Sequence, residues 1–157
     1  VSLGESGHPE LSWKRGGDSL VSMHRLEQIA PEQIPTTHHK EAYKFTNEWT
    51  VQLPKGYSAL FTHPLNRTDL PFQTLSGVVD GDSYLSPVNF PFLLRKDFQG
   101  VIEAGTPIVQ VIPFKREPWK HKLEKFDQMF ANKQMAVFGK TLVGFYKKFS
   151  WHKKEYL

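Results

Sequence analysis

The chain has 157 residues, no cysteine and a formal net charge of +4 at pH 7. Such a chain suits one domain and can bury roughly two thirds of its unfolded surface in a single core. The lack of cysteine excludes disulfides, thiolate nucleophiles and zinc–thiolate sites. No apolar run approaches the ~20 residues that span a bilayer, so we expect a soluble protein with no membrane partner.

The basic character is concentrated at the C-terminal end. Residues 115–157 hold 11 Lys and Arg against 4 Asp and Glu, a balance of +7, which leaves −3 for residues 1–114. A basic segment can meet nucleic acid, an anionic membrane or an acidic protein. The simpler interpretation is the solvated face of a lysine-rich helix, and both interpretations stay open at this point.

Turn residues divide the first 114 residues into short strand-forming stretches. The predicted strands are the halves of a hairpin at 11–24 that turns at Gly16 and Gly17, and then 43–53, 57–61, 75–80, 88–94 and 106–114. We expect 25–40 to be a connecting loop with one helical turn at 26–33, and 63–71 to be a polar loop. Many short strands at this spacing predict antiparallel pairing in a small barrel or sandwich.

After Pro113 the apolar residues change to helical spacing. This spacing predicts one helix at 118–131, with Pro118 in its first turn, and a second at 134–149. The predicted organisation is therefore a β-rich core domain at 1–114 and a basic, amphipathic helical appendage at 115–157 that packs on the core. The fold class is mainly β (α+β).

Three stretches follow the order of motifs in dUTPases and their deaminase relatives. These are LPKGYSALF at 53–61, GVVDGDSY at 77–84 and IEAGTPIVQVI at 102–112. The chain resembles that group in a proline–glycine turn before a strand, an aspartate-bearing hairpin and a closing strand. The resemblance implies a single β-clip-like core.

The same resemblance weakens at the residues that would react. In those enzymes an arginine–serine pair and backbone groups hold phosphate, and a hairpin aspartate activates water. Here the loop at 63–67 has Arg67 but no following serine, Asp80 takes the place of the aspartate, and Leu85 and Ser86 replace an arginine–glycine pair. The glycine-rich C-terminal arm is missing, so we name no catalytic residue.

A longer set of motifs resembles a family of phage, marine-metagenome and bacterial proteins of unknown function. It comprises WTVQLPKGYSALF at 49–61, PLNR at 64–67, GVVDGD at 77–82, VNFPF at 88–92 and GTPIVQVIPFKR at 105–116. This resemblance implies a protein of unknown function that is soluble in a bacterial host's cytoplasm or associated with a virion. It implies no activity, cofactor or ligand.

The polar residues among the strands allow two interpretations. Asp80 and Asp82 can close a turn by accepting backbone N–H groups, with Gly81 between them. Alternatively, amide, carboxylate and guanidinium groups line one pocket for a small polar ligand, with an aromatic ring over its apolar face. The candidate pocket residues are Asn66, Arg67, Asp80, Asn89, Phe90 and Gln110.

The leading hypothesis is a non-catalytic binding or assembly protein, because each catalytic pattern is incomplete. The alternative is a dUTPase- or deaminase-like enzyme for a nucleotide or another small molecule. The histidines lack the spacing of a metal site, so we expect no metal and no cofactor. We expect a homo-oligomer formed through the C-terminal helices, and we favour this over nucleic acid binding by the tail's aromatic and lysine residues.

Overall fold

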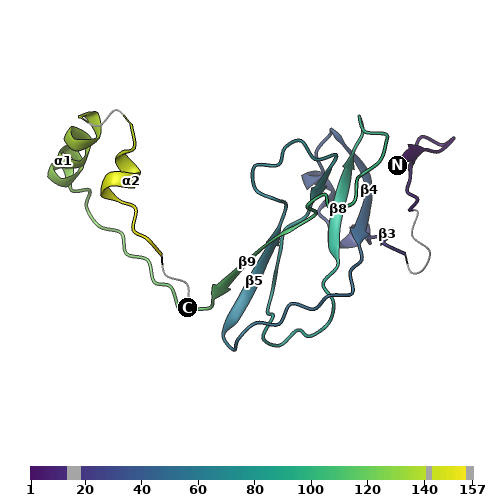
Figure 1. Ribbon diagram of the computed structural model, residues 1–157, viewed down its shortest axis with the longest axis horizontal. Coiled ribbons are helices and arrows are strands. Elements are labelled where there is room, and N and C mark those ends of the chain that lie inside the picture. The colour runs from purple at the N-terminus through teal and green to yellow at the C-terminus, as the bar shows by residue number, and fades with distance from the viewer. Residues whose placement is uncertain (14–18, 141–142, 155–157) are drawn as a thin grey trace. The chain divides into compact units, whose positions relative to one another are not determined.

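The chain divides into two compact units. The computed structural model describes residues 1–13, 19–140 and 143–154. The β unit is Val1–Glu117 and the C-terminal unit is Pro118–Leu157 (Figure 1). The turn predicted at Gly16 and Gly17 lies outside the described residues. The hairpin pairing predicted at 11–24 is wrong, because residues 11–13 form no strand and residues 21–23 pair with residues 43–45.

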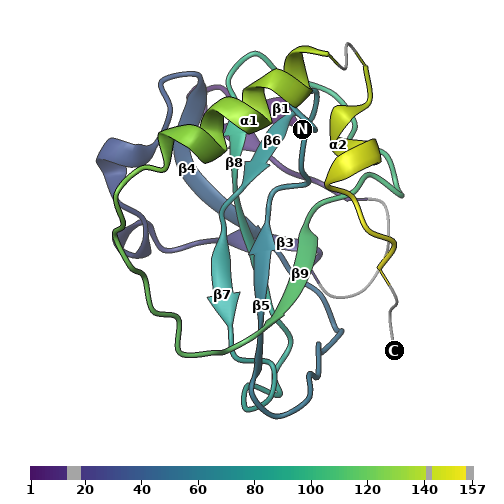
Figure 2. The same ribbon diagram turned by 90° about the vertical axis from the view of Figure 1, so that its left-hand side faces the viewer.

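Antiparallel strands form three sheets in the β unit (Figure 2). The strands are β1 (Ser2–Leu3), β2 (Pro9–Glu10), β3 (Val21–Met23), β4 (His38–Phe45), β5 (Tyr57–Thr62), β6 (Phe72–Thr74), β7 (Gly77–Val79), β8 (Phe90–Arg95) and β9 (Gln110–Lys115). The sheet orders are β1-β2, β3-β4-β8-β6 and β7-β5-β9. The mainly β class is confirmed, and the described strands form separate sheets instead of one closed barrel.

Several predicted strands are found with shifted ends, and one is misplaced. Strand β5 matches the prediction at 57–61, while β7, β8 and β9 fall largely within predicted runs. The strand predicted at 43–53 is wrong beyond Phe45, because the strand is instead β4, which starts at His38. Residues 46–53 form isolated hydrogen bonds instead of a ladder, such as the 3.0 Å bond from Leu53 N to Gly81 O.

The connection between β3 and β4 contains two short 3₁₀ turns. These are η1 (Leu26–Gln28) and η2 (Pro31–Gln33), which lie in the stretch where one helical turn was expected. The loop predicted to extend to residue 40 ends earlier, because His38 already pairs with Arg95 of β8. Pairing with a distant strand therefore overrides the polar character of the sequence at this point.

The core of the β unit lies on one face of the four-stranded sheet. Its buried cluster is formed by Tyr43, Leu70, Phe72, Phe92 and Leu94. Phe92 is fully buried, and its ring lies 4.0 Å from that of Phe45 and 5.7 Å from that of Phe72, centroid to centroid. Stacked and edge-on aromatic rings of this kind fix the position of β4 against β6 and β8.

Strand β9 forms an edge of the three-stranded sheet and contains a proline. Pro113 stands opposite Ala59 of β5, and Arg116 N donates to Gly56 O at 2.8 Å. Because hydrogen-bonded and non-hydrogen-bonded pairs alternate along antiparallel strands, Ala59 and Pro113 form a non-hydrogen-bonded pair. The proline nitrogen therefore faces away from β5, where its missing hydrogen costs the ladder nothing.

In the described part of the C-terminal unit, the helices are α1 (Gln128–Gly139) and α2 (Phe145–Phe149). The helices predicted at 118–131 and 134–149 are therefore wrong in their limits. Helix α1 starts late because the Asp127 carboxylate accepts the Phe130 N–H at 2.8 Å, which caps the helix at that residue. Gly144, at a φ of 77°, precedes α2 and turns the chain through a conformation that favours glycine.

In the described part of the chain, no helix has the length and apolar character that a membrane span requires.

Candidate functional site

The hairpin aspartates of GVVDGDSY meet Arg116 at the end of β9. Arg116 Nη1 donates to Asp80 Oδ1 at 3.2 Å and to Asp82 Oδ1 at 3.0 Å, and Nη2 donates to Asp82 Oδ2. The same Nη1 lies 2.9 Å from Ser58 Oγ, and Ser58 donates to Asp80 Oδ1 at 2.6 Å. We call Ser58, Asp80, Asp82 and Arg116 the arginine cluster.

The arginine cluster joins three segments that are distant in the sequence. Asp82 Oδ2 also accepts the backbone N–H of Gly56 at 2.8 Å, in the turn that precedes β5. Gly81 lies under this turn: a Cβ there would stand 3.0 Å from the Leu53 side chain and 3.1 Å from Val51 O. The two aspartates thus have a structural role. Through Gly56 and Arg116 they connect the turn before β5 to the end of β9.

Asp82 is the most strongly held carboxylate of the arginine cluster. Its side chain is only 9% exposed, whereas that of Asp80 is 58% exposed. The hydrogen bonds from Arg116, and then the one from Gly56, lower the pKa of Asp82 to about 2. The same pairing raises the pKa of Arg116.

We expect Asp82→Asn to change how the stability of the β unit depends on pH. A carboxylate with a lowered pKa stabilises the fold above its ordinary pKa of 3.8, and this contribution is lost as the pH falls towards about 2. The variant should therefore be less stable than the parent at pH 7, and the difference should shrink towards pH 2. Urea denaturation at pH 7, 4 and 2 measures this.

Glu48→Gln is the control for this experiment, because Glu48 is exposed and has no ion pair among the described residues. Its stability should follow that of the parent at each pH. A constant difference between Asp82→Asn and the parent from pH 7 to pH 2 would contradict the assigned role of the Asp82–Arg116 pair.

The six candidate pocket residues do not line one cavity. Asn89 and Phe90 line a cavity of about 490 Å³, Asp80 and Asn89 line one of about 560 Å³, and Arg67 lines one of about 430 Å³. Gln110 Oε1 accepts the backbone N–H of Leu65 at 3.0 Å, so Gln110 holds the loop that contains Asn66 and Arg67.

Asn66 has a backbone role. It is exposed and adopts a φ of 63°, the left-handed conformation that asparagine tolerates better than most residues. The loop is held further by His63, whose Nε2 lies 2.9 Å from Arg67 O. The segment PLNR is thus a tight turn that fixes the position of Arg67.

The cavity of about 490 Å³ lies between the two larger sheets. Phe61 of β5 and Val79 of β7 line it from the three-stranded sheet, and Gln73 of β6 and Phe90 of β8 line it from the four-stranded sheet. The rings of Phe61 and Phe90 are stacked with their centroids 5.8 Å apart. This cavity combines an aromatic wall with polar side chains, as small-molecule sites do.

His24 and Asn89 supply polar groups to this cavity and also to the neighbouring cavity of about 360 Å³. Burial, and then the charge of Lys44, lower the pKa of His24. Its imidazole is therefore neutral at pH 7 and offers one donor and one acceptor. A neutral polar ligand suits this surface.

Two residues at these sites were not predicted from the sequence. Arg116 carries the arginine cluster, and the motif GTPIVQVIPFKR that ends at this residue was the available signal. His24 gave no signal, because its position in the cavity depends on the distant strand β8. Among the described residues, no group of three His, Asp or Glu side chains is arranged to hold a metal ion.

Comparison with known proteins gives no relative for this chain: no protein-family model matches it, and no curated protein or solved structure is significantly similar to it. The function is therefore inferred from the arginine cluster, the cavities and the surface of the C-terminal unit.

Proposed function

We propose that this chain is a non-catalytic binding or assembly protein whose C-terminal unit associates with a second copy of the chain. The observation that carries the proposal is the apolar surface of that unit. Neither α1 nor α2 has a buried residue. Taken by itself, the unit leaves large side chains exposed, including Trp119 at 87%, Leu123 at 94% and Phe130 at 61%.

The C-terminal unit is too short to cover these side chains by itself. A segment of about 40 residues seldom buries a core of its own. Its internal packing is a small aromatic cluster in which Phe145 contacts Phe138 and Phe149, at centroid distances of 5.3 and 5.2 Å. Exposed apolar patches of this kind mark interaction surfaces, because covering them releases about 25 cal/mol per Å².

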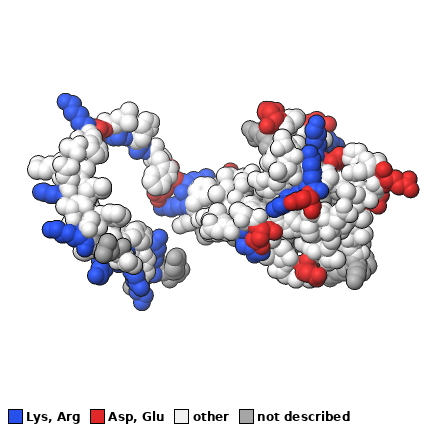
Figure 3. Space-filling view, turned by 90° about the horizontal axis from the view of Figure 1, so that it is seen from above, with Lys and Arg blue, Asp and Glu red and all other residues white. Residues whose placement is uncertain are grey.

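Charge also favours association with a copy of the chain. Residues 118–157 hold nine Lys against three Asp and Glu, a balance of +6, which leaves −2 for residues 1–117. Figure 3 shows the lysines along the C-terminal unit, whereas the β unit mixes both signs. A basic apolar segment and an acidic β unit on another copy have complementary charges.

The arginine cluster supports binding over hydrolysis. The alternative dUTPase- or deaminase-like function needs a hairpin carboxylate that is available to activate water. Asp80 accepts hydrogen bonds from Ser58 and Arg116, and Asp82 accepts them from Arg116 and Gly56. Asp82 is thus engaged through both of its carboxylate oxygens, and Asp80 through Oδ1.

The β-clip architecture and a phage, metagenome or bacterial origin belong to the same proposal. The β-clip interpretation is supported by the pairing of β5 with both β7 and β9, which brings the GVVD strand and the closing strand to the two sides of YSALF. In this proposal the β unit is a rigid scaffold, and its cavity near Asn89 is open to a small polar ligand.

The test is the molar mass of the purified chain, measured by light scattering across a range of concentrations. We expect the parent to form a defined oligomer and the double variant Phe130→Asp, Met135→Asp to be monomeric, because both apolar side chains would become charged. Both positions are exposed, at 61% and 69%, so the β unit should melt at the same temperature in both proteins.

Gln134→Asp is the matched control, since it adds a charge to α1 at an exposed polar position. It should form the same oligomer as the parent. A monomeric parent at every concentration, or a control that dissociates as fully as the double variant, would exclude assembly through this unit.

A further inference from the structure

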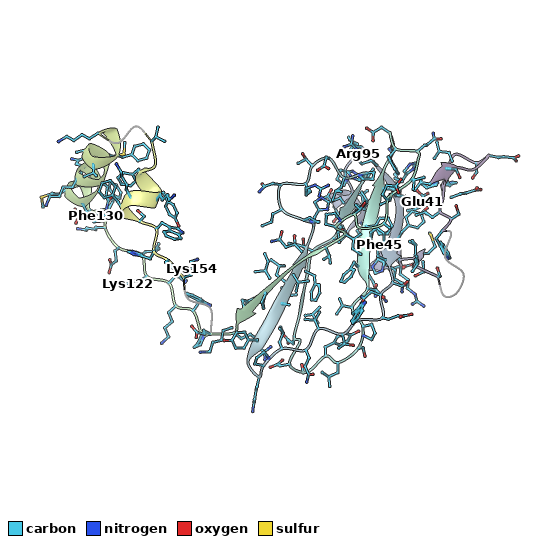
Figure 4. All side chains as sticks on the ribbon, viewed as in Figure 1. Glu41, Phe45, Arg95, Lys122, Phe130 and Lys154 are labelled. Atoms are coloured by element: carbon cyan, nitrogen blue, oxygen red, sulfur yellow. The ribbon has the colours of Figure 1, made fainter. Side chains whose placement is uncertain are left out.

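The cavity that Arg67 lines gathers basic and polar groups. It measures about 430 Å³ and lies where β4 begins, β6 begins and β8 ends. Figure 4 labels Arg95 at this end of β8 and Phe45 further along the same sheet. The polar groups lining the cavity come from Thr37, His38, His63, Arg67, Thr68, Gln73 and Arg95.

Two arginines of this cavity are held in the same way by an aspartate two residues later. Arg67 donates from Nε and Nη2 to the two oxygens of Asp69, each at 2.8 Å. Arg95 donates from Nε and Nη2 to Asp97 at 2.9 and 2.5 Å. Each guanidinium is thus fixed along one edge by a two-pronged contact, which is the geometry that limits its rotation.

The opposite edge of each guanidinium is available to a ligand. Within the described residues, Nη1 of Arg67 and Nη1 of Arg95 form no hydrogen bond. The two side chains are 40% and 39% exposed, so the groups are reachable from solvent. Two guanidinium groups from different segments of the chain, each with an Nη1 that is unpaired among the described residues, therefore line one cavity.

The backbone positions of both arginines are fixed. Thr74 N donates to His63 Nδ1 at 3.2 Å, so the ring hydrogen is on Nε2 and is donated to Arg67 O at 2.9 Å. Arg95 N donates to Pro71 O at 3.0 Å. The site is built before any ligand arrives, which lowers the entropy cost of binding.

The floor of the cavity is apolar. Leu70 and Phe72 line it and are only 5% and 2% exposed. Next to such a surface the local dielectric is lower than in water, so hydrogen bonds from a charged donor are stronger. Because Asp69 and Asp97 balance the charge of the arginines, recognition depends on the direction of the two donors more than on net charge.

We propose that this cavity binds an oxyanion, best a phosphate group, between Nη1 of Arg67 and Nη1 of Arg95. The Thr68 hydroxyl, which forms no hydrogen bond among the described residues, is a further donor. The site differs from the arginine cluster and from the cavity near Asn89, and it does not depend on assembly through the C-terminal unit. The phosphate is either the free ion or part of a small molecule.

The test titrates the full chain with inorganic phosphate, against sodium chloride at equal ionic strength. Phosphate should raise the melting temperature by an amount that increases with its concentration, because it binds the folded state. Arg67→Gln and Arg95→Gln should each weaken phosphate binding about tenfold or more, as expected for a lost hydrogen bond from a charged donor.

Arg25→Gln is the matched control. It removes the same charge from a residue that lines a different cavity, and it should leave phosphate affinity within about twofold of the parent. Arg67→Lys adds a second comparison, because lysine keeps the charge but lacks the planar guanidinium that holds Asp69 along one edge and leaves Nη1 for a ligand on another. It should weaken binding as well.

A nucleoside monophosphate and the corresponding nucleoside distinguish the two sources of phosphate. Tighter binding of the monophosphate than of free phosphate would assign the cavity to a phosphorylated small molecule, and equal binding would assign it to the ion. The proposal is overturned if phosphate gives no shift beyond that of chloride. It is also overturned if Arg25→Gln weakens binding as much as Arg67→Gln, or if the nucleoside binds as well as its monophosphate.

Discussion

Replacing Phe92 by alanine should lower the free energy of unfolding of the β unit by about 3–5 kcal/mol. Phe92 is fully buried and contacts the rings of Tyr43, Phe45 and Phe72, so the substitution leaves a cavity between β4, β6 and β8. Because small domains are stable by only about 5–15 kcal/mol, this loss is a large fraction of the total. Urea denaturation followed by far-UV circular dichroism measures it.

Phe114→Ala is the matched control for Phe92→Ala. Phe114 lies in β9 and is 40% exposed, so its truncation removes the same group from a partly solvated position. We expect a loss of about 1 kcal/mol or less. Equal losses for the two variants would mean that the aromatic cluster around Phe92 is not the core of the β unit.

Arg116→Met should destabilise the β unit more than substitution of Lys115, the charged residue that precedes it and ends β9. It leaves the Asp82 carboxylate, which is 9% exposed, without its cation, and it releases the contacts to Ser58 and Asp80. Without Arg116 the pKa of Asp82 should rise towards its ordinary value of 3.8. Lowering the pH from about 4 to about 2 should therefore destabilise the variant much less than it destabilises the parent.

Lys115→Met is the control for Arg116→Met. Lys115 is the preceding residue and the last of β9, and its 2.9 Å ion pair with Glu117 joins two exposed side chains. Exposed pairs contribute about 0–1 kcal/mol, so the urea midpoint should barely change. Equal midpoints for the two variants would contradict a stabilising role for the arginine cluster.

The sequence pattern predicted the strands that a clear turn or a continuous apolar run marks. Pro54 and Gly56 mark the start of β5, and the apolar run after Val88 marks β8. The sequence did not reveal where β4 begins, because His38 and His39 look like loop residues and enter a strand only through pairing with β8. The alternation at 46–53 was misleading for the opposite reason, since no neighbouring strand pairs with it.

The candidate site was predicted only in part for a related reason. The polar residues of GVVDGDSY and PLNR stood out among strand-forming neighbours. Both segments form hydrogen bonds with other parts of the fold, Asp82 with Gly56 and Arg67 with His63. The partners of these residues could not be deduced, because Asp82 and Arg116 are 34 residues apart in sequence. Likewise, nothing in the sequence shows that Arg67 and Arg95 line one cavity.

The proline of β9 has a consequence for contacts between molecules. An exposed strand edge with a full row of amide hydrogens can pair with a strand of another chain, which is the first step of many β-aggregates. Pro113 has no amide hydrogen, and its nitrogen faces away from β5. The row of amide hydrogens at the outer edge of β9 therefore has a gap at this residue. An incoming strand would lose a hydrogen bond in the middle of its ladder, so this edge resists fibril-like growth.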